Sequence, residues 1–153
     1  MGYTHYFSKI SKTSENEKKL YEAIQVIKEI EQKLPQRFKT AEIAYTKKAK
    51  IRNTDGFGYP IFSVNYIAFN GDAMTNSDYE SLVLTFEKDR FNFCKTARKP
   101  YDLFVCLCLI TVANYIDDFE FSSDGNYKDW KFAFKWYKRN IGKINSHIYK
   151  FID

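Results

Sequence analysis

Residues 93–102, with the sequence FCKTARKPYD, carry the chain's most concentrated set of groups that could bind an anion. Lys95, Arg98 and Lys99 supply three cations beside the Thr96 hydroxyl, and the proline that follows suits the first turn of a helix. A helix start offers free amides and a favourable dipole to negative charge, and an arginine can hold a phosphate through two N–H groups. We therefore predict an anion site made by Lys95, Thr96, Arg98 and the amides of that helix. The alternative is a solvated basic turn that needs no ligand.

We group further polar and aromatic side chains with this anion site. Asp124 and Asn70 each precede a glycine in a predicted turn, where they could contact a ribose hydroxyl or a base edge, although ordinary turn roles are commoner. His5 stands in a predicted strand, where a histidine is more often packed and hydrogen-bonded than catalytic. The full predicted ligand-binding set is His5, Tyr6, Asn70, Lys95, Thr96, Arg98, Tyr101, Asp102, Asp124 and Trp130.

Familiar catalytic and metal-binding patterns are absent from the sequence. Residues 55–58 (DGFG) match neither a phosphate-binding loop nor a dinucleotide fingerprint, and neither G-x-S-x-G nor H-E-x-x-H occurs. Cys94, Cys106 and Cys108 lack the spacing of a zinc site, so we predict buried reduced thiols. We expect no catalytic residues, no metal and no cofactor, which favours a binding protein over an enzyme.

The net charge of +5 is unevenly distributed along the chain. Residues 1–52 carry twelve Lys or Arg against six acids, residues 53–127 carry five against eleven, and residues 128–153 carry seven against two. The two basic flanks could form one basic face for an anionic partner, or they could be separate solvated helix faces. Lysine outnumbers arginine, without the arginine clusters typical of base readout, so we do not expect nucleic acid as a partner.

Hydrophobic periodicity and turn residues predict the elements that position these groups. The predicted order is strand 2–9, helix 14–34, strands 63–69 and 81–87, helix 100–115, strand 119–121 and a last helix that ends near residue 140. Ser14 and Glu17 match a capping box for the first helix, which Pro35 ends. Asn126 or Ser123 caps the last helix. Residues 37–52 allow either a short helix or an extended segment, and residues 53–60 are a loop.

This order predicts an α+β fold, a single domain over residues 1–153 in which about three helices pack on a small antiparallel or mixed sheet. The longest apolar run, residues 103–116, is too short to span a bilayer and suits a buried helix. The N-terminus lacks an apolar targeting segment. We therefore expect a cytoplasmic protein that does not enter a membrane.

Four segments together resemble a family of small, uncharacterised phage and prophage proteins: MGYTHY at residues 1–6, FNG at 69–71, FCKTARKPYD at 93–102, and SDG at 123–125 followed by Trp130. The resemblance covers nearly the whole chain and implies no particular activity. It implies a setting, the cytoplasm of an infected or lysogenic bacterium, where small accessory proteins often counter host defence. The four segments coincide with the polar groups described above, which is why we treat those groups as one pocket.

Three functions remain open at this level. The first is a sponge that sequesters a small phosphate-bearing, nucleotide-like ligand and so counters host defence signalling. The second is an inhibitor of a host defence protein, which acts through the basic flanks and through surface aromatics such as Tyr127, Trp136 and Tyr137. The third is a small enzyme on a nucleotide or nucleic acid, with His5 as acid or base. In each case the chain could also act as a homo-oligomer.

Overall fold

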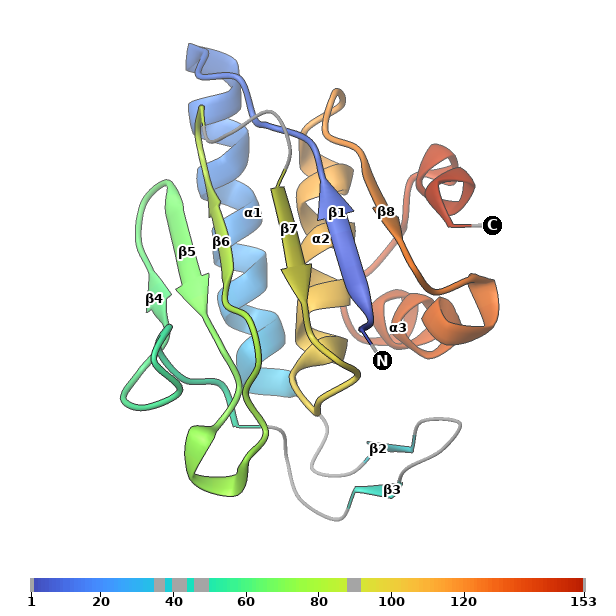
Figure 1. Ribbon diagram of the computed structural model, residues 1–153. Helices are drawn as coiled ribbons and strands as arrows, with labels where there is room; N and C mark the ends of the chain where they lie inside the picture. Colours follow the sequence, from blue (N-terminus) through green and yellow to red (C-terminus); the bar gives the residue numbers. More distant parts are fainter. Residues whose placement is uncertain (1, 35–37, 40–43, 46–49, 88–91, 153) are drawn as a thin grey trace.

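The computed structural model describes residues 2–34, 38–39, 44–45, 50–87 and 92–152 of the chain. These residues have the α+β fold expected from the sequence, with two small antiparallel sheets of three strands each. In Figure 1 the strands of both sheets lie side by side, with α1 and α2 behind them and α3 beside β8. Among the described residues no helix is both long and apolar enough to cross a membrane.

The elements have the following bounds. The strands are β1 (Thr4–Phe7), β2 (Phe38–Lys39), β3 (Ala44–Tyr45), β4 (Ile61–Phe62), β5 (Tyr66–Phe69), β6 (Leu82–Thr85), β7 (Asn92–Lys95) and β8 (Phe121–Ser123). The helices are α1 (Ser14–Lys33), α2 (Asp102–Tyr115) and α3 (Tyr127–Asn140), with 3-10 turns η1 (Ala73–Thr75) and η2 (Ser146–Phe151). Most of the ambiguous segment 37–52 lies outside the described residues; within it β2 and β3 pair as an antiparallel ribbon.

The first sheet has the order β7-β1-β8, with β1 in the centre and both pairings antiparallel. Its register places His5 opposite Cys94 on one side and opposite Ser123 on the other. The sequence did not predict β7, which we had read as part of the binding segment. Four residues that alternate between buried and exposed become a strand here because β1 supplies the hydrogen-bonding partner.

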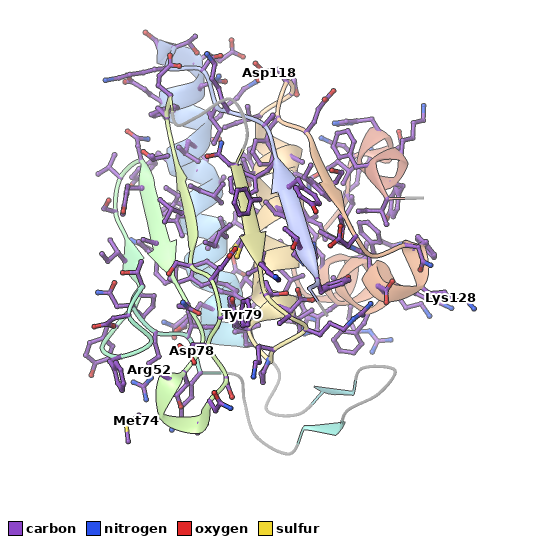
Figure 2. The ribbon with its side chains drawn as sticks, in the orientation of Figure 1. Arg52, Met74, Asp78, Tyr79, Asp118 and Lys128 are labelled. Carbon is purple, nitrogen blue, oxygen red and sulfur yellow. The ribbon has the colours of Figure 1, made fainter. Side chains whose placement is uncertain are left out.

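The second sheet, of order β4-β5-β6, contains the hairpin predicted from the sequence. The strand expected at residues 63–69 begins only at Tyr66, because residues 63–65 form the turn from β4. The Glu80 amide donates to the Lys95 carbonyl (3.1 Å), which links the start of β6 to the end of β7. The loops at one end of this sheet carry Arg52, Met74, Asp78 and Tyr79 (Figure 2).

The helices supply most of the core. Nearly every residue of α2 is buried, as its apolar sequence predicts, and α2 packs along α1. The predicted capping box of α1 is wrong by one position: the N-cap is Thr13, whose hydroxyl accepts from the Asn16 amide (3.0 Å). A true capping box begins α3, where Asn126 is the N-cap and Asp129 closes the box.

The strand predicted at residues 119–121 is displaced by two positions in the structure, to Phe121–Ser123. Phe119 instead lies in the core, where its ring packs against that of Phe7. Pairing with β1 decides where this strand lies, because the local sequence suits either choice. The displacement matters for the site, since it places Ser123 inside the strand beside His5.

Candidate functional site

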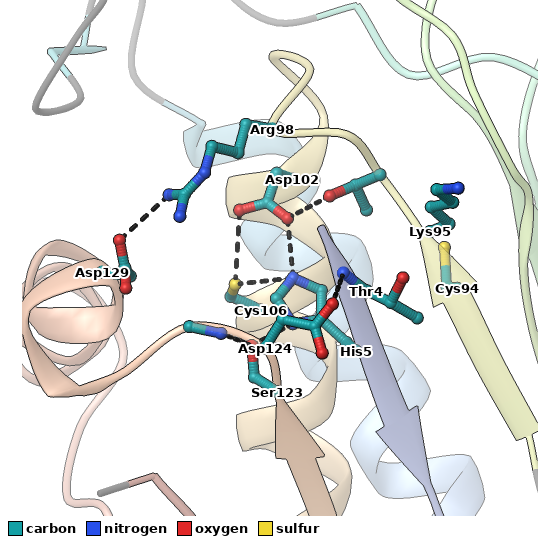
Figure 3. A network of polar contacts seen from close by, with 12 residues as sticks. Thr4, His5, Cys94, Lys95, Arg98, Asp102, Cys106, Ser123, Asp124 and Asp129 are labelled. Atoms are coloured by element: carbon teal, nitrogen blue, oxygen red, sulfur yellow. Dashed lines mark hydrogen bonds and ion pairs between the residues drawn. The ribbon is translucent and has the colours of Figure 1, made fainter. Parts of the chain in front are cut away.

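His5 lies at the centre of a buried polar network. Its side chain points from β1 toward α2, on the same face as Tyr3 and Phe7, and it has no solvent exposure. Its Nδ1 is 2.8 Å from the Ser123 hydroxyl, and its Nε2 is 2.7 Å from the Asp102 carboxylate (Figure 3). Strand pairing supplies the first contact, and the start of α2 supplies the second.

Asp102, the first residue of α2, joins this network to the turn before the helix. Its Oδ1 accepts from the Thr96 hydroxyl at 2.5 Å as well as facing His5. Cys106, one helical turn further along α2, places its sulfur 3.7 Å from Asp102 Oδ2 and 3.7 Å from His5 Nε2. The Asp102 side chain is 22% exposed, so solvent reaches the network at this residue.

The hydrogen bonds have a consistent polarity when the imidazole is neutral. A carboxylate can only accept, so Nε2 of His5 carries the proton that faces Asp102. Nδ1 then accepts a hydrogen bond from the Ser123 hydroxyl. The Ser123 oxygen in turn accepts one from the Gly125 amide at 2.9 Å. This tautomer is assigned from the network. It gives a chain from hydroxyl to imidazole to carboxylate, the order that serves proton transfer.

Aromatic rings enclose the imidazole. Tyr3 and Trp130 each meet His5 edge to face, with ring centroids 5.0 and 5.2 Å away. Burial raises the pKa of Tyr3, so its hydroxyl stays protonated. Within the described part of the chain, the Trp130 Nε1 is buried without a hydrogen-bond partner. The rings keep water from the imidazole and hold its plane fixed.

The turn before α2 has an unusual backbone. Ala97 and Arg98 both have positive φ, at 51° and 57°, and the Lys99 amide donates to the Thr96 carbonyl at 3.0 Å. Residues other than glycine seldom take this conformation, and two in succession are held only where surrounding contacts impose it. The contacts here are the amides of Thr96 and Ala97, which both donate to the Tyr3 carbonyl.

This backbone fixes the position of the Arg98 guanidinium. The group lies 3.9 Å over the Tyr3 ring and donates to Asp129 on α3 at 3.0 Å. The Arg98 side chain is 47% exposed, so it covers the network while facing solvent. Three elements far apart in sequence, β1, the turn and α3, therefore meet around one half-exposed cation.

Asp124 holds the end of β8 to β1. Its carboxylate accepts from the Thr4 amide and from the Tyr6 hydroxyl, both at 3.0 Å, and its own amide donates to the Thr4 carbonyl. Asp124 is exposed, so it faces solvent beside the network. Its hydrogen bonds are the ordinary ones of a strand end, and they also place a carboxylate at the rim of the site.

Three of the predicted binding residues lie on the side of the second sheet. The Asn70 side chain bonds to the loops around it, and the buried Tyr101 hydroxyl donates to the Glu80 carbonyl at 2.5 Å. The Lys95 ammonium lies 5.7 Å from the Tyr79 ring. The structure thus brings His5, Thr96 and Asp102 into direct contact, places Trp130 and Arg98 beside them, and sets Asn70, Lys95 and Tyr101 further toward β6. Tyr6 alternates with His5 along β1 and therefore points to the opposite face of the sheet, where it meets Asp124.

Sequence reasoning missed Ser123, Cys106 and Asp129 as members of the site. We had read Ser123 as a turn or capping residue and Cys106 as a simple buried thiol. The spacing of Asp102 and Cys106, four positions apart on a helix, places both on one face and was a usable signal. Ser123 had no such signal, because its role depends on the register of β8.

Of the aromatics that we expected at the surface, one is buried and another is partly buried. Tyr137 is 2% exposed, and Trp136 packs partly against the core. The reason is the orientation of α3, whose buried face is Trp130, Ala133, Phe134 and Tyr137. Of the three aromatics named for a protein interface, Tyr127 is exposed, at 44%.

Comparisons with protein-family models, with curated proteins and with solved structures found no match to this chain. The geometry of the site itself is therefore the basis for a functional assignment. That geometry offers a proton-transfer chain, a fixed half-exposed guanidinium and carboxylates at the rim.

Proposed function

We propose that this protein binds and sequesters a small phosphate-bearing, nucleotide-like ligand at the Arg98 surface, which we define as residues 96–99 with Asp102 and Asp129. The observation that carries the proposal is the turn in which Ala97 and Arg98 both have positive φ. Strained backbone of this kind is concentrated at ligand sites, where it holds side chains in position for a ligand. Here the strain holds one planar cation at the rim of a buried polar network.

The chemistry of Arg98 supports a phosphate group as part of the ligand. A guanidinium presents its N–H donors in a fixed plane and can bind a phosphate through two of them. The Tyr3 ring at 3.9 Å keeps this plane in place before any ligand arrives, which lowers the entropy lost on binding. The half-exposed side chain leaves the cation accessible.

The carboxylates around Arg98 indicate that the ligand carries other groups besides a phosphate. Asp129 accepts a hydrogen bond from the guanidinium at 3.0 Å, and the Asp102 carboxylate is 22% exposed next to the turn that carries Arg98. Both carboxylates would repel a bare anion. A ligand that also carries hydrogen-bond donors, such as ribose hydroxyls or a base amino group, would satisfy them. We therefore expect a nucleotide to bind better than inorganic phosphate. In the phage setting that the resemblance implies, such binding would remove a nucleotide signal from host defence.

Calorimetry and thermal shift against cyclic and linear nucleotides, with inorganic phosphate for comparison, test the proposal. Arg98→Asn is the informative variant, since asparagine tolerates the positive φ while the guanidinium is lost. Lys128→Asn on the exposed face of α3 is the matched control for charge. We expect binding that Arg98→Asn abolishes and Lys128→Asn retains. No binding across the panel by folded protein refutes the proposal.

A second candidate, an enzyme on a nucleotide, is favoured by one specific observation. His5 contacts a hydroxyl through one ring nitrogen and a carboxylate through the other, as a general base does. Arg98 is placed where it could stabilise charge that develops on a phosphate. Mass spectrometry of the ligand after denaturation separates the two candidates. A ligand recovered intact supports sequestration, whereas a product supports catalysis.

Inhibition of a host protein through an interface predicts a different outcome. Lys128, Lys131 and Lys135 are exposed on α3 and would contribute to such an interface. Charge reversal at these three lysines should then abolish activity in infected cells, and Arg98→Asn should leave it intact. That pair of results would exclude the ligand-binding proposal.

A further inference from the structure

Three side chains of different chemistry converge inside the polar network. His5 Nε2, an Asp102 carboxylate oxygen and Cys106 Sγ all lie within 4.8 Å of one another. His5 comes from β1, while Asp102 and Cys106 lie one turn apart on the same face of α2. An imidazole, a carboxylate and a thiol are the three common protein ligands of zinc-type cations.

We propose that His5, Asp102 and Cys106 form a binding site for one thiophilic divalent cation of the Zn²⁺ type. Around tetrahedral zinc, a nitrogen and a sulfur ligand lie about 3.5 Å apart, and a nitrogen and an oxygen about 3.3 Å. Here Nε2 and Sγ are 3.7 Å apart, and so are Oδ2 and Sγ. Nε2 and Oδ1, at 2.7 Å, share a hydrogen bond and would separate by about 0.6 Å when the cation replaces the proton.

The neighbours of the three ligands are those that metal ligands usually have. A coordinating histidine normally bonds through its other ring nitrogen, and a coordinating carboxylate is normally hydrogen-bonded in turn. Ser123 contacts Nδ1 at 2.8 Å, and the Thr96 hydroxyl donates to Asp102. With metal bound, Nδ1 carries the imidazole proton and donates to Ser123. The site needs no change of fold to become a coordination sphere.

The charge balance also suits a divalent cation. Asp102 and a Cys106 thiolate together would neutralise two positive charges in a buried position. In the metal-free protein, burial raises the pKa of the Cys106 thiol well above its ordinary value, so the sulfur is protonated. Coordination releases that thiol proton to solvent while the sulfur–metal bond forms.

Three protein ligands leave one coordination position open, as in catalytic zinc sites. Of the three, Asp102 has solvent contact, at 22%, whereas His5 and Cys106 are buried. The open position is therefore reached past Asp102, from the Arg98 surface. A phosphate oxygen of the ligand could occupy it, and this last step rests on the proposed function, while metal binding itself does not.

The test is a titration of metal-stripped protein with Co²⁺ alone, followed by competition with Zn²⁺. We expect one equivalent of Co²⁺ to produce sulfur-to-metal charge-transfer absorption in the near ultraviolet and the visible bands of a four-coordinate ion. Cys106→Ala should lose the charge-transfer band. Cys108→Ala is the matched control, because Cys108 is an equally buried thiol on α2 outside the cluster, and it should keep the band.

Ser123→Ala provides a milder variant that keeps all three ligands. Loss of the contact to Nδ1 should weaken Co²⁺ binding by about 10- to 100-fold with the charge-transfer band retained. Circular dichroism shows that each variant is folded. The proposal is overturned if folded wild-type protein binds no Co²⁺, or if Cys106→Ala retains the charge-transfer band. Because no nucleotide is present, neither result bears on ligand binding at the Arg98 surface.

Discussion

His5 and Asn70 are both buried polar side chains, at 0% and 3% exposure, yet their hydrogen-bond partners differ in kind. Asn70 accepts from the amides of Gly71 and Tyr79 and donates to the Tyr79 carbonyl, so most of its partners are backbone groups. In the described part of the chain, the His5 ring nitrogens contact side-chain groups: the Ser123 hydroxyl, the Asp102 carboxylate and the Cys106 thiol.

The difference lies in what the partners can exchange. A backbone amide does not give up its proton and a backbone carbonyl has none, so the Asn70 bonds can only hold the loops at residues 54 and 79 in place. A hydroxyl, an imidazole and a carboxylate can pass protons or bind a cation. We infer that the Asn70 region has a structural role and that the His5 region is the functional site. The following predictions test whether the two regions differ in this way.

The largest effect is expected from Gly71→Ala, in the Asn70 region. An added Cβ would lie 2.0 Å from the Ser77 carbonyl oxygen and 2.7 Å from the Tyr101 ring, so backbone must move. We expect a loss of about 3 kcal/mol in the free energy of unfolding, measured by urea denaturation. Gly58→Ala is the control: its φ is positive but its Cβ meets nothing within 4 Å, so it should cost about 1 kcal/mol. Equal losses would contradict the steric explanation.

Asn70→Ala should destabilise the protein by about 2 kcal/mol, since it leaves the Gly71 and Tyr79 amides without their acceptor. Asn65→Ala, which removes one exposed bond to the Glu17 carbonyl, should cost under about 1 kcal/mol. Once folded, Asn70→Ala should bind Co²⁺ and nucleotide as the wild type does. If it loses either, Asn70 belongs to the functional site and the comparison fails.

Gly125→Ala likewise adds a Cβ at a crowded glycine, here in the His5 region. We expect it to lower the free energy of unfolding by about 1–2 kcal/mol. The added Cβ would lie 2.1 Å from the Tyr3 hydroxyl, a side-chain atom that can move. Tyr3→Phe removes that oxygen, so the cost of Gly125→Ala should be smaller in the Tyr3→Phe background, which a double-mutant cycle measures. An unchanged cost in the cycle would show that the strain lies elsewhere.

The smallest effect is expected from Asp129→Asn, which should lower the free energy of unfolding by about 0.5 kcal/mol at neutral pH. Burial raises the pKa of Asp129, but the Asn126 amide and Arg98 outweigh it and hold the pKa below its usual value. A lowered pKa gives stability that is present above the unfolded pKa and lost as the pH falls through the folded pKa. Urea denaturation at several acid pH values should therefore show a shallower decline for Asp129→Asn. A decline as steep as that of the wild type would show that ionised Asp129 does not stabilise the folded protein.

Local sequence was sufficient for the elements that local forces form. Apolar periodicity predicted α1, an unbroken apolar run after Pro100 predicted α2, Asn126 was one of two predicted caps of α3, and alternation predicted the β5–β6 hairpin. Residues 95–99 were correctly recognised as a segment that precedes a helix, although α2 begins at Asp102 and not at Pro100. The errors included the N-cap of α1, a local choice between Thr13 and Ser14. They also included the missing β7 and the displaced β8, which depend on partners distant in sequence.

The sequence by itself therefore determined the α+β class, the helices and the i, i+4 placement of Asp102 and Cys106 on one face of α2. Only the tertiary structure decided that His5 meets Asp102, 97 positions away, and Ser123, 118 positions away. The physical reason is that both contacts are non-local: the register between β1 and β8 brings Ser123 to His5, and the packing of α2 against the sheet brings Asp102. The cations of residues 95–99 are evident in the sequence, whereas the buried contacts of His5 are seen only in the structure.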